Sequence, residues 1–381
     1  MYKILISGYY GFNNIGDESI LQAVVNNLTG KLDDIEITVL SQNPHSTTEK
    51  YGVKSEDRKS AFKVAAAIRQ CDLLISGGGS LLQDSTSRKS IYYYLMIMWL
   101  ATLFGKKYFI YSQGIGPINS KLSRVATAAT LKKASGIVVR DEASKDFLVE
   151  IGVPEEKVII TADPVLSLKP VSLDVGQAIL RDEGFRRLDG TKIIGFAIKE
   201  RKLNSQFVDE LEKAIRRLVD EENAQVVLIP FHHQEDMAVI EALEKRLNDK
   251  VFAIKHKYLT NEMMSIIGNM DLLVGVRLHS LIHAAIMNVR MIGISYDPKI
   301  NSFLNSIGLK ALSTTIDFNS EYFIEEYHRV VDPSYESTCA RVRERVAGMV
   351  KSLGTNEEMI KKIMEGHSTN EKSNENMGNS R

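Results

Sequence analysis

The sequence contains little cysteine and no excess of charge of either sign. Its 381 residues include only two cysteines, Cys71 and Cys339. Two cysteines so far apart argue against a disulfide framework and are typical of buried free thiols in a reducing cytoplasm. Lys and Arg number 48, as do Asp and Glu, so no overall field attracts nucleic acid or anionic lipid. We expect no nucleic-acid partner, and local cations must bind any anionic ligand.

The sequence also lacks an apolar run as long as the about 20 residues that a bilayer-spanning helix needs. The most apolar run, 91–104, is shorter. We expect it to form a buried helix of a layered fold, with contact to a membrane-held substrate as the alternative. The N-terminus enters an apolar strand at once, without room for a signal peptide. These features predict a cytoplasmic protein without a transmembrane segment, which can associate peripherally with the cytoplasmic membrane face.

What the sequence has is a regular alternation of short apolar runs with amphipathic segments, which is typical of parallel α/β sheets. We expect strands at 3–7, 36–40, 73–76, 108–112, 136–139, 158–161, 192–198, 225–230, 251–255, 272–275 and 291–295. The pattern restarts near Lys192, and the length suits two domains. We predict an N-terminal domain over 1–165, a linker over 166–190, a C-terminal domain over 191–318, a helical segment over 319–353 that packs across the domains, and a polar tail over 354–381, disordered at its end.

The most informative motif is 271–280, where an apolar strand runs into Arg277, Leu278, His279 and Ser280. Side chains just after a parallel strand meet the ligand crevice. In extended backbone Arg277 and His279 would project to the same face and act on one ligand. The stretch 72–82 echoes this motif, with glycines in place of the cation and the imidazole.

Glycine-rich turns follow two strands of the first half. Gly8–Glu18, in the order GYYGFNNIGDE, includes Asn14, Gly16 and Asp17. It matches neither the GxGxxG nor the Walker pattern, so nucleotide binding is poorly supported. The second turn contains Gly78, Gly79 and Ser80 and leads to Asp84. Such turns allow backbone to approach a ligand closely. Asp84 is placed to act as a general base or to cap a helix.

Other polar groups also follow predicted strands. Gln113 precedes Gly114, and Lys199 and Arg201 follow the first strand of the second half, where cations suit a phosphorylated or carboxylated substrate. A solvated charged loop is the alternative for both cations. Arg140 with Asp141 is typical of a local ion pair. His232 and His233 lack further ligands at metal-site spacing, so we predict no metal.

In order and spacing, GFNNIGDE at 11–18, GGGS at 77–80 with Asp84, QGIGP at 113–117, Arg140-Asp141, ADP at 162–164 and RLH at 277–279 resemble the polysaccharide pyruvyltransferase family. The resemblance runs from the first strand to about Leu353 and is greatest to bacterial enzymes that modify secondary cell-wall polymers, on which S-layer proteins are anchored. It implies two Rossmann-like domains facing across a cleft, as in GT-B glycosyltransferases. It also implies phosphoenolpyruvate as donor, with no cofactor besides, and a 4,6-linked pyruvate ketal on a hexose such as N-acetylmannosamine of a lipid-linked precursor.

These implications assign a role to each candidate residue. His279 would be the general acid, since imidazole titrates near neutrality, and Arg277 would grip the donor's carboxylate or phosphate with Lys199 or Arg201 in support. Asp84, or alternatively Asp17, would activate an acceptor hydroxyl against the glycine turns. A glycosyltransferase using a nucleotide sugar and a non-catalytic glycan-binding protein are the rival hypotheses. A homo-oligomer is compatible with the sequence.

Overall fold

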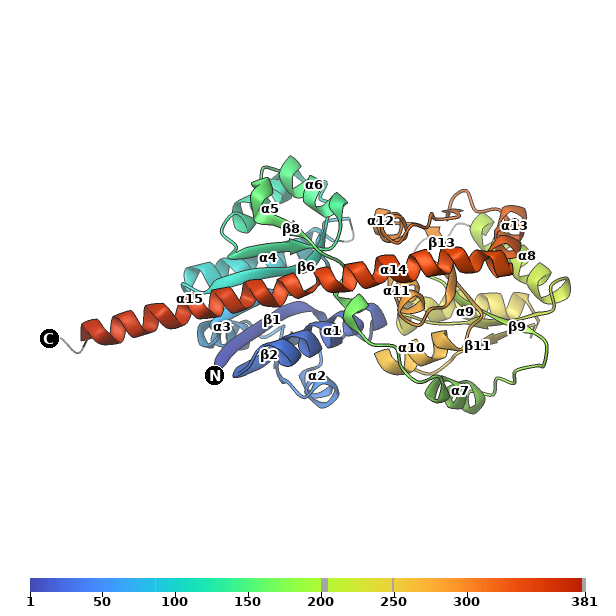
Figure 1. Cartoon of the computed structure of the whole chain (residues 1–381), viewed down its shortest axis with the longest axis horizontal. Coiled ribbons are helices and arrows are strands. Elements are labelled where there is room, and N and C mark those ends of the chain that lie inside the picture. Colours follow the sequence, from blue (N-terminus) through green and yellow to red (C-terminus); the bar gives the residue numbers. More distant parts are fainter. Residues whose placement is uncertain (86, 200–204, 249, 379–381) are drawn as a thin grey trace. The chain divides into compact units, whose positions relative to one another are not determined.

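The computed structural model describes residues 1–85, 87–199, 205–248 and 250–378, and the chain divides into two compact units. Unit 1 comprises Met1–Phe12, Ile20–Ser167 and Met349–Arg381, and unit 2 comprises Asn13–Ser19 and Leu168–Gly348. Each unit is an α/β body built on a parallel sheet (Figure 1). The predicted pair of parallel-sheet domains is thereby confirmed.

The sheet of unit 1 has eight strands in the order β3-β2-β1-β4-β6-β7-β8, with β5 paired to β6. The strands are β1 (Tyr2–Tyr10), β2 (Ile35–Ser41), β3 (Lys54–Asp57), β4 (Leu73–Ser76), β5 (Gly79–Leu82), β6 (Lys107–Ile115), β7 (Gly136–Val139) and β8 (Val158–Ile160). The helices are α1 (Ile15–Lys31), α2 (Pro44–Tyr51), α3 (Ala61–Gln70), α4 (Arg88–Leu103), α5 (Lys121–Leu131), α6 (Glu142–Glu150) and α15 (Gly354–Gly378). The first turn of α1 belongs to unit 2.

The sheet of unit 2 has six strands in the order β11-β10-β9-β12-β13-β14. They are β9 (Lys192–Ala197), β10 (Ala224–Leu228), β11 (Val251–Ala253), β12 (Leu272–Gly275), β13 (Arg290–Ser295) and β14 (Ser313–Thr314). The helices are α7 (Leu173–Asp182), α8 (Ser205–Asp220), α9 (His233–Arg246), α10 (Thr260–Gly268), α11 (Leu278–Ile286), α12 (Pro298–Ser306), α13 (Ser320–Val331) and α14 (Glu336–Ser352), the last of which continues into unit 1.

The echo between 72–82 and 271–280 has a structural cause. The strands β4 and β12 occupy the same place in their sheets, directly beside the first strand of each unit. The carboxylate of Asp72 accepts the backbone amide of Lys3 at 2.8 Å, and that of Asp271 accepts the amide of Ile193 at 2.7 Å. Each Asp thus fastens the start of the neighbouring strand, which explains why Asp-Leu-Leu recurs.

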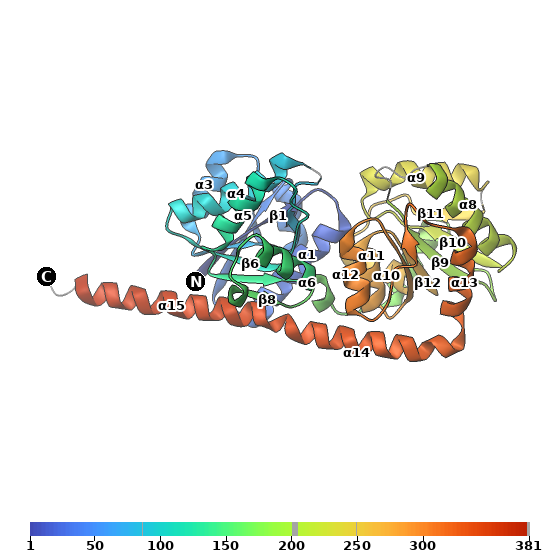
Figure 2. The same cartoon turned by 90° about the horizontal axis from the view of Figure 1, so that it is seen from above.

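Alternate residues of the central strands are buried on opposite faces of each sheet, because successive side chains of a strand point to opposite sides. In unit 1, Leu5, Leu74 and Ile110 belong to one core cluster with side chains of α3, α4 and α5, and Figure 2 shows these helices on the side of the sheet opposite α15. In unit 2, Ile194 and Val274 pack with α8, α9 and α13. Both faces of each sheet are therefore covered, as parallel sheets require.

Two predicted boundaries need correction. The segment 166–190, predicted as a linker, contains α7, which packs on α10 because the Gly176 amide donates to Ser265 Oγ at 2.6 Å. The segment 354–381, predicted as a polar tail, forms α15 as far as Gly378, and its last three residues lie outside the described residues. The first turn of α15 packs because Glu357, which is buried, accepts from Lys31 at 2.8 Å and from the Tyr111 hydroxyl.

The predicted strands 3–7, 73–76 and 272–275 fall on β1, β4 and β12. Three short strands, β3, β5 and β14, were missed, since none has a strong apolar run. The run 91–104 forms α4, as expected of a helix, but one side of α4 is exposed. Within the described ranges, no helix is both long and apolar enough to cross a bilayer.

Candidate active site

The candidate site of unit 2 lies where the strand order reverses. Strands β10 and β11 continue from one side of β9, whereas β12, β13 and β14 continue from the other. In open parallel sheets, ligands bind outside the carboxyl ends of the strands at such a switch point. Lys199 follows β9, Arg277 and His279 follow β12, and Tyr296 follows β13. Four chemically active side chains are therefore supplied by the ends of three neighbouring strands.

Arg277 is the residue that precedes α11, and its side chain contacts acidic residues of α9. Its guanidinium pairs with the buried carboxylate of Asp236 and lies 3.4 Å from Glu235. Asp236 also accepts the backbone amides of Phe231 at 3.0 Å and His232 at 2.8 Å. Arg277 is only 8% exposed, and its Nε has no hydrogen-bond partner among the described residues. The guanidinium is thus fixed in place with donor capacity left for a ligand.

His279 is the second residue of α11 and packs against a glycine. A Cβ added to Gly16 would stand 2.8 Å from Cγ and 2.9 Å from Cε1 of the imidazole, and closer still to Nδ1. A side chain on residue 16 would therefore displace the ring. The sequence argument that Arg277 and His279 share a face of extended backbone was wrong, because β12 ends at Gly275 and α11 begins at Leu278. What brings the two residues near one place is the strand-to-helix turn.

Tyr296 lies between two lysines. Lys199 Nζ donates to the Tyr296 hydroxyl at 2.9 Å and stands 4.5 Å from the ring centroid, and Lys299 Nζ stands 5.9 Å from that centroid. Burial opposes ionisation of the phenol, but Lys299, Lys199 and Arg277 outweigh burial and lower the pKa of Tyr296. The cations therefore stabilise negative charge on this phenol, although Asp297 lies 3.4 Å from Lys299.

His232 and Glu235 stand at the start of α9, on the other side of Arg277. Burial, followed by the charge of Arg277, lowers the pKa of His232 despite the nearby Glu235 and Asp236. Burial tends to raise the pKa of Glu235, but His232, Arg277 and Lys199 lower it overall. These shifts favour the ionised form of Glu235 and the neutral form of His232.

Three residues near His279 have packing roles. Leu278 and Ser280 were predicted to bind substrate, but both side chains are buried, and Ser280 Oγ donates to the Arg277 carbonyl at 2.6 Å. These side chains therefore stabilise the turn. His283 is fully buried, with its Nε2 3.0 Å from Ser19 Oγ and its ring against Phe231, so it packs inside unit 2.

Asn14 and Asp17 lie in the segment Asn13–Ser19, which belongs to unit 2. On the sequence alone, this segment was expected to belong to the N-terminal domain. Asn14 forms a bridge with His232 and accepts the Gly16 amide at 3.1 Å. Asp17 lies in the first turn of α1. The sequence grouped these residues with the first strand because they follow it in the chain. Arg201, predicted to bind substrate, lies outside the described residues.

The glycine turn of unit 1 is tightly packed. A Cβ at Gly78 would stand 2.9 Å from Ile20 and 3.1 Å from Pro164, and Gly79 has a φ of +90° that favours glycine. Instead of ending in a loop, this turn leads into β5. Gln113 is fully buried and donates to the Gly77 carbonyl at 2.8 Å, while its Oε1 has no partner among the described residues. The glycines therefore permit close packing, and Gln113 supports them.

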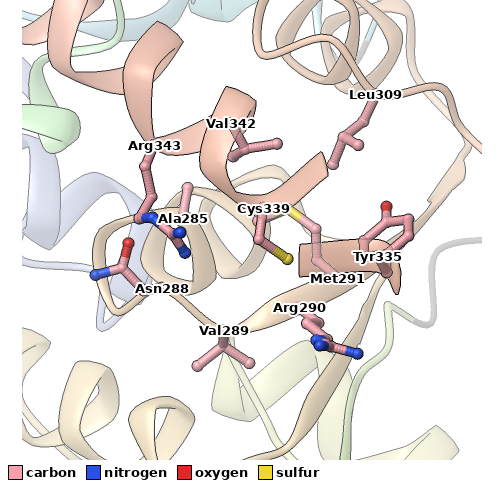
Figure 3. Close-up of a pocket in the computed structure, with 10 residues that line it drawn as sticks. All are labelled: Ala285, Asn288, Val289, Arg290, Met291, Leu309, Tyr335, Cys339, Val342 and Arg343. Atoms are coloured by element: carbon pink, nitrogen blue, oxygen red, sulfur yellow. The ribbon is translucent and has the colours of Figure 1, made fainter. Parts of the chain in front are cut away.

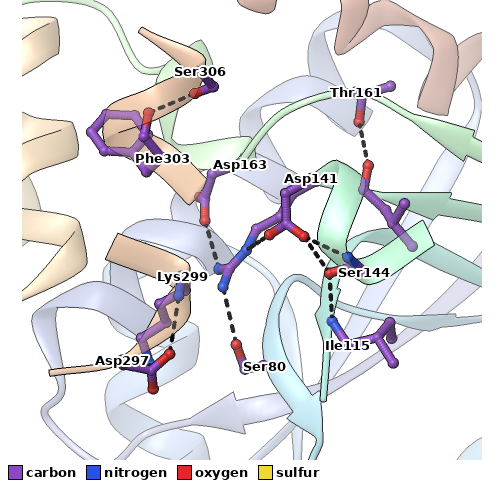
Figure 4. Close-up of polar contacts among 12 residues, drawn as sticks. Ser80, Ile115, Asp141, Ser144, Thr161, Asp163, Asp297, Lys299, Phe303 and Ser306 are labelled. Carbon is purple, nitrogen blue, oxygen red and sulfur yellow. Dashed lines mark hydrogen bonds and ion pairs between the residues drawn. The ribbon is translucent and has the colours of Figure 1, made fainter. Parts of the chain in front are cut away.

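Ser80 belongs to a buried ionic cluster in unit 1. Arg140 donates to Ser80 Oγ at 3.1 Å, to Asp163 at 3.0 Å and to Asp141 at 3.3 Å (Figure 4). Asp141 also caps α6, since its carboxylate accepts from Ser144 N at 2.8 Å and from Ser144 Oγ at 2.6 Å. The predicted ion pair of Arg140 and Asp141 is present and is extended by Asp163.

Asp84 has a capping arrangement. Its two carboxylate oxygens accept the amides of Asn119 at 2.7 Å and Ser120 at 2.9 Å, and Ser120 is the residue before α5. Of the two roles considered for Asp84, these contacts favour the structural one, because both oxygens are engaged by the chain itself.

Sequence reasoning missed Tyr296, Lys299, Asp236 and Glu235. Tyr296 could have been found, because it directly follows a predicted strand, as Lys199 and Arg277 do. Asp236 and Glu235 lie inside α9, and nothing in the local pattern indicates that they reach Arg277.

A small pocket elsewhere in unit 2 contains none of the predicted site residues. Figure 3 shows its lining, which comes from the end of α11, from β13 and from α14, with Met291, Cys339 and Val342 beside Arg290 and Arg343. In the part of the chain that is described, no group of three His, Cys, Asp or Glu side chains is arranged to hold a metal ion.

Comparison with known proteins identifies the family of the chain. The polysaccharide pyruvyl transferase family model matches residues 14–298, about three quarters of the chain. The amylovoran biosynthesis protein AmsJ of Erwinia amylovora is 21% identical over 92% of this chain and its own full length.

Solved structures show the same fold at low identity. HepE of Anabaena, in complex with UDP and glucose, matches with a TM-score of 0.65 and 11% identity over 96% of this chain and all of that one. The UDP-GlcNAc 2-epimerase of Neisseria meningitidis matches with a TM-score of 0.63 and 14% identity over 95% of this chain and all of that one. These neighbours agree with the expected GT-B-like fold. On the match of the family model, the chain belongs to the polysaccharide pyruvyl transferase family.

Proposed function

We propose that this protein transfers pyruvate from phosphoenolpyruvate to two hydroxyls of a hexose, forming a 4,6-ketal and releasing phosphate. The acceptor would be a lipid-linked cell-wall polysaccharide precursor, with N-acetylmannosamine as the hexose, made in the cytoplasm for polymers that anchor S-layer proteins. The observation that supports the proposal is the group of Arg277, His279, Lys199 and Tyr296 at one switch point. The name of the relative AmsJ, a biosynthesis protein for amylovoran, supports a polysaccharide product.

The chemistry needs a proton donor beside a site for anions. A proton is added to the methylene carbon of the enol phosphate, and the first sugar hydroxyl attacks the cationic carbon that results. Phosphate then leaves, and the second hydroxyl attacks the same carbon. One hydroxyl proton balances the proton taken up by the methyl group, and the other leaves with phosphate. No oxidant, reductant or further cofactor is required.

The residues of unit 2 suit the donor. We assign His279 as the general acid, because an imidazole titrates near neutral pH, and because Gly16 leaves room for its ring. Arg277 would bind the carboxylate or phosphate through the donors that Asp236 leaves available. Lys199 and Lys299 add positive charge, and the N-terminus of α11 favours an anion.

The acceptor base is less constrained by the contacts. Asp84 is engaged by the Asn119–Ser120 turn. Asp17, which follows Gly16 directly in the first turn of α1, is the alternative base. In unit 1 we propose Ser80, which is partly exposed, as the acceptor contact, with Gly78, Gly79 and Gln113 shaping the turn that carries it.

The alternative enzyme is a glycosyltransferase or epimerase that uses a nucleotide sugar, because the structures of HepE and the epimerase hold UDP or UDP-sugars. Titration calorimetry with phosphoenolpyruvate and with UDP separates the two enzymes. A purely glycan-binding protein would release no phosphate from phosphoenolpyruvate in the presence of acceptor.

The direct test incubates the purified protein with phosphoenolpyruvate and lipid-linked disaccharides, and follows phosphate release and product mass. We expect His279→Ala to abolish transfer without loss of fold. His256→Ala is the control, because His256 is exposed and pairs with Glu183. Arg277→Lys should also fail, since an ammonium cannot form two parallel hydrogen bonds to a carboxylate. Near-normal turnover by His279→Ala would refute the acid assignment.

A further inference from the structure

Two neighbouring helices of unit 1 expose apolar side chains in regular rows. On α4 the exposed residues include Met96, Trp99 and Leu103, and on α5 they include Leu122 and Val125. Leu103 is 75% exposed, Leu122 69% and Val125 67%. Spacings of three and four residues place each set on one side of its helix. We call these five residues the apolar stripes.

The two stripes follow one another along adjacent helices. The Tyr92 hydroxyl accepts from Ser123 Oγ at 3.3 Å, and Trp99 Nε1 donates to Thr130 Oγ1 at 2.7 Å. Both contacts join residues that are 31 positions apart, so the helices run in parallel and in register. Figures 1 and 2 show α4 and α5 side by side. By this register Leu122 and Val125 lie level with Ile91 and Tyr94, and the α4 stripe follows further along the helix pair. The stripes therefore form one surface over about three helical turns.

The segment that contains this surface has charge of one sign only. Residues 85–140 include nine Lys and Arg and no Asp or Glu, whereas the chain as a whole has 48 of each. At the chain's average frequency, a stretch of that length would have about seven acidic residues. Exposed lysines stand at both ends of the helix pair: Lys89 and Lys121 at the start, and Lys132 and Lys133 at the end.

Two acidic groups near this segment are already engaged. Glu150 pairs with Arg124 at 2.7 Å, and Asp84 accepts the amides before α5. The ninth cation, Arg140, is buried with Asp163. The segment that carries the stripes therefore contributes only positive charge to this part of the surface.

We propose that the apolar stripes dock unit 1 on the surface of an anionic lipid bilayer. Large exposed apolar surfaces on soluble proteins mark interaction sites, and apolar helix faces flanked by Lys are typical of interfacial membrane binding. A Trp within the surface suits the headgroup region, where one end of the ring is apolar and the other polar. Each Lys near an anionic surface adds attraction. The inference uses neither donor nor acceptor residues, so it stands apart from the proposed reaction.

Charge favours lipid over a second copy of the chain. Two copies that met through this surface would bring two sets of lysines together, and like charges repel. An anionic bilayer matches both properties at once, because it accepts the apolar side chains and attracts the lysines.

The test is co-sedimentation of the full chain with vesicles of phosphatidylcholine, alone or mixed with phosphatidylglycerol. We expect binding to the mixed vesicles and little binding to phosphatidylcholine. Each of Leu103→Glu and Val125→Glu should weaken binding by about tenfold or more, because each removes an aliphatic side chain that the bilayer would bury. Ile316→Glu is the matched control, since Ile316 is 72% exposed but lies in unit 2, and it should bind as the unaltered chain does.

A second measurement needs no variant. Trp99 is the only tryptophan, so its fluorescence reports on the stripe directly. Emission should shift to shorter wavelength with mixed vesicles but not with phosphatidylcholine. No shift and no co-sedimentation would overturn the proposal, as would an equal loss of binding in Ile316→Glu. A dimer in gel filtration that Leu103→Glu dissociates would assign the surface to a second copy instead.

Discussion

Gly16→Ala is the substitution that most directly tests the role of His279. A Cβ at residue 16 would stand 2.8 Å and 2.9 Å from two carbons of the imidazole, whereas ordinary carbon contacts are about 3.5 Å or longer. The ring must therefore move by about 0.6 Å at those carbons and further at Nδ1. Misplacement of a reacting group by about 1 Å costs about 100-fold in rate, so we expect kcat to fall by about 10-fold to 100-fold.

The same change should have little effect on folding. Gly16 is helical, as the second residue of α1, and Ala is favoured over Gly in a helix by up to about 1 kcal/mol. This gain offsets part of the strain of moving the ring. Gly30→Ala in the same helix is the matched control, because nothing lies within 4 Å of a Cβ there. It should keep full turnover and raise the free energy of unfolding slightly.

The assay is phosphate release from phosphoenolpyruvate with a saccharide acceptor, together with urea unfolding of each variant. If the loss acts through the imidazole, adding Gly16→Ala to His279→Ala should cause little further loss, since substitutions that disrupt one interaction are not additive. If the turnover of Gly16→Ala stays within about threefold of that of the unaltered chain, the position of this ring does not limit the reaction.

Three further predictions concern Asp236, His232 and Asp84. Asp236→Asn should lower the free energy of unfolding by about 3 kcal/mol, because it leaves the buried Arg277 without its main partner; a loss below about 1 kcal/mol in urea titration would mean that Glu235 suffices. Stability should fall as pH drops below about 6.5, where His232 is protonated in the unfolded chain but not in the folded one, since its folded pKa is lowered. His232→Asn, which retains a capping acceptor, should reduce that slope in unfolding measured from neutral to acid pH, and an unchanged slope would exclude His232 as its source. Asp84→Ala should cost about 1 kcal/mol of stability through the lost cap and leave kcat nearly unchanged; a loss of 100-fold or more would restore Asp84 as the base.

Much of the fold follows from local patterns. The apolar runs 73–76 and 272–275 coincide with β4 and β12, because strands buried on both faces need continuous apolar residues. Ser and Asp before helices also act locally, as Ser120 and Asp141 do for α5 and α6. Short strands such as β3 lie at a sheet edge and need no such run, so they were missed.

The candidate site could be predicted only in part. The sequence predicts that Arg277 and His279 follow a strand, but their presence at a switch point depends on the strand order, which only the structure shows. The start of the helix at Leu278 was not foreseen, because apolar residues continue past the end of the strand at Gly275 to Val276.

The sequence by itself determined the two parallel sheets, the family and the strand ends that supply the chemistry, since these depend on residues that are close in the chain. Only the tertiary structure decided which partners these residues have. Asp236 meets Arg277 and Gly16 meets the ring of His279 across separations of tens to hundreds of residues. Such contacts depend on how helices pack on a sheet, and no local pattern specifies them. The same reason explains why two modest apolar rows on α4 and α5 become one surface only after the helices lie in register.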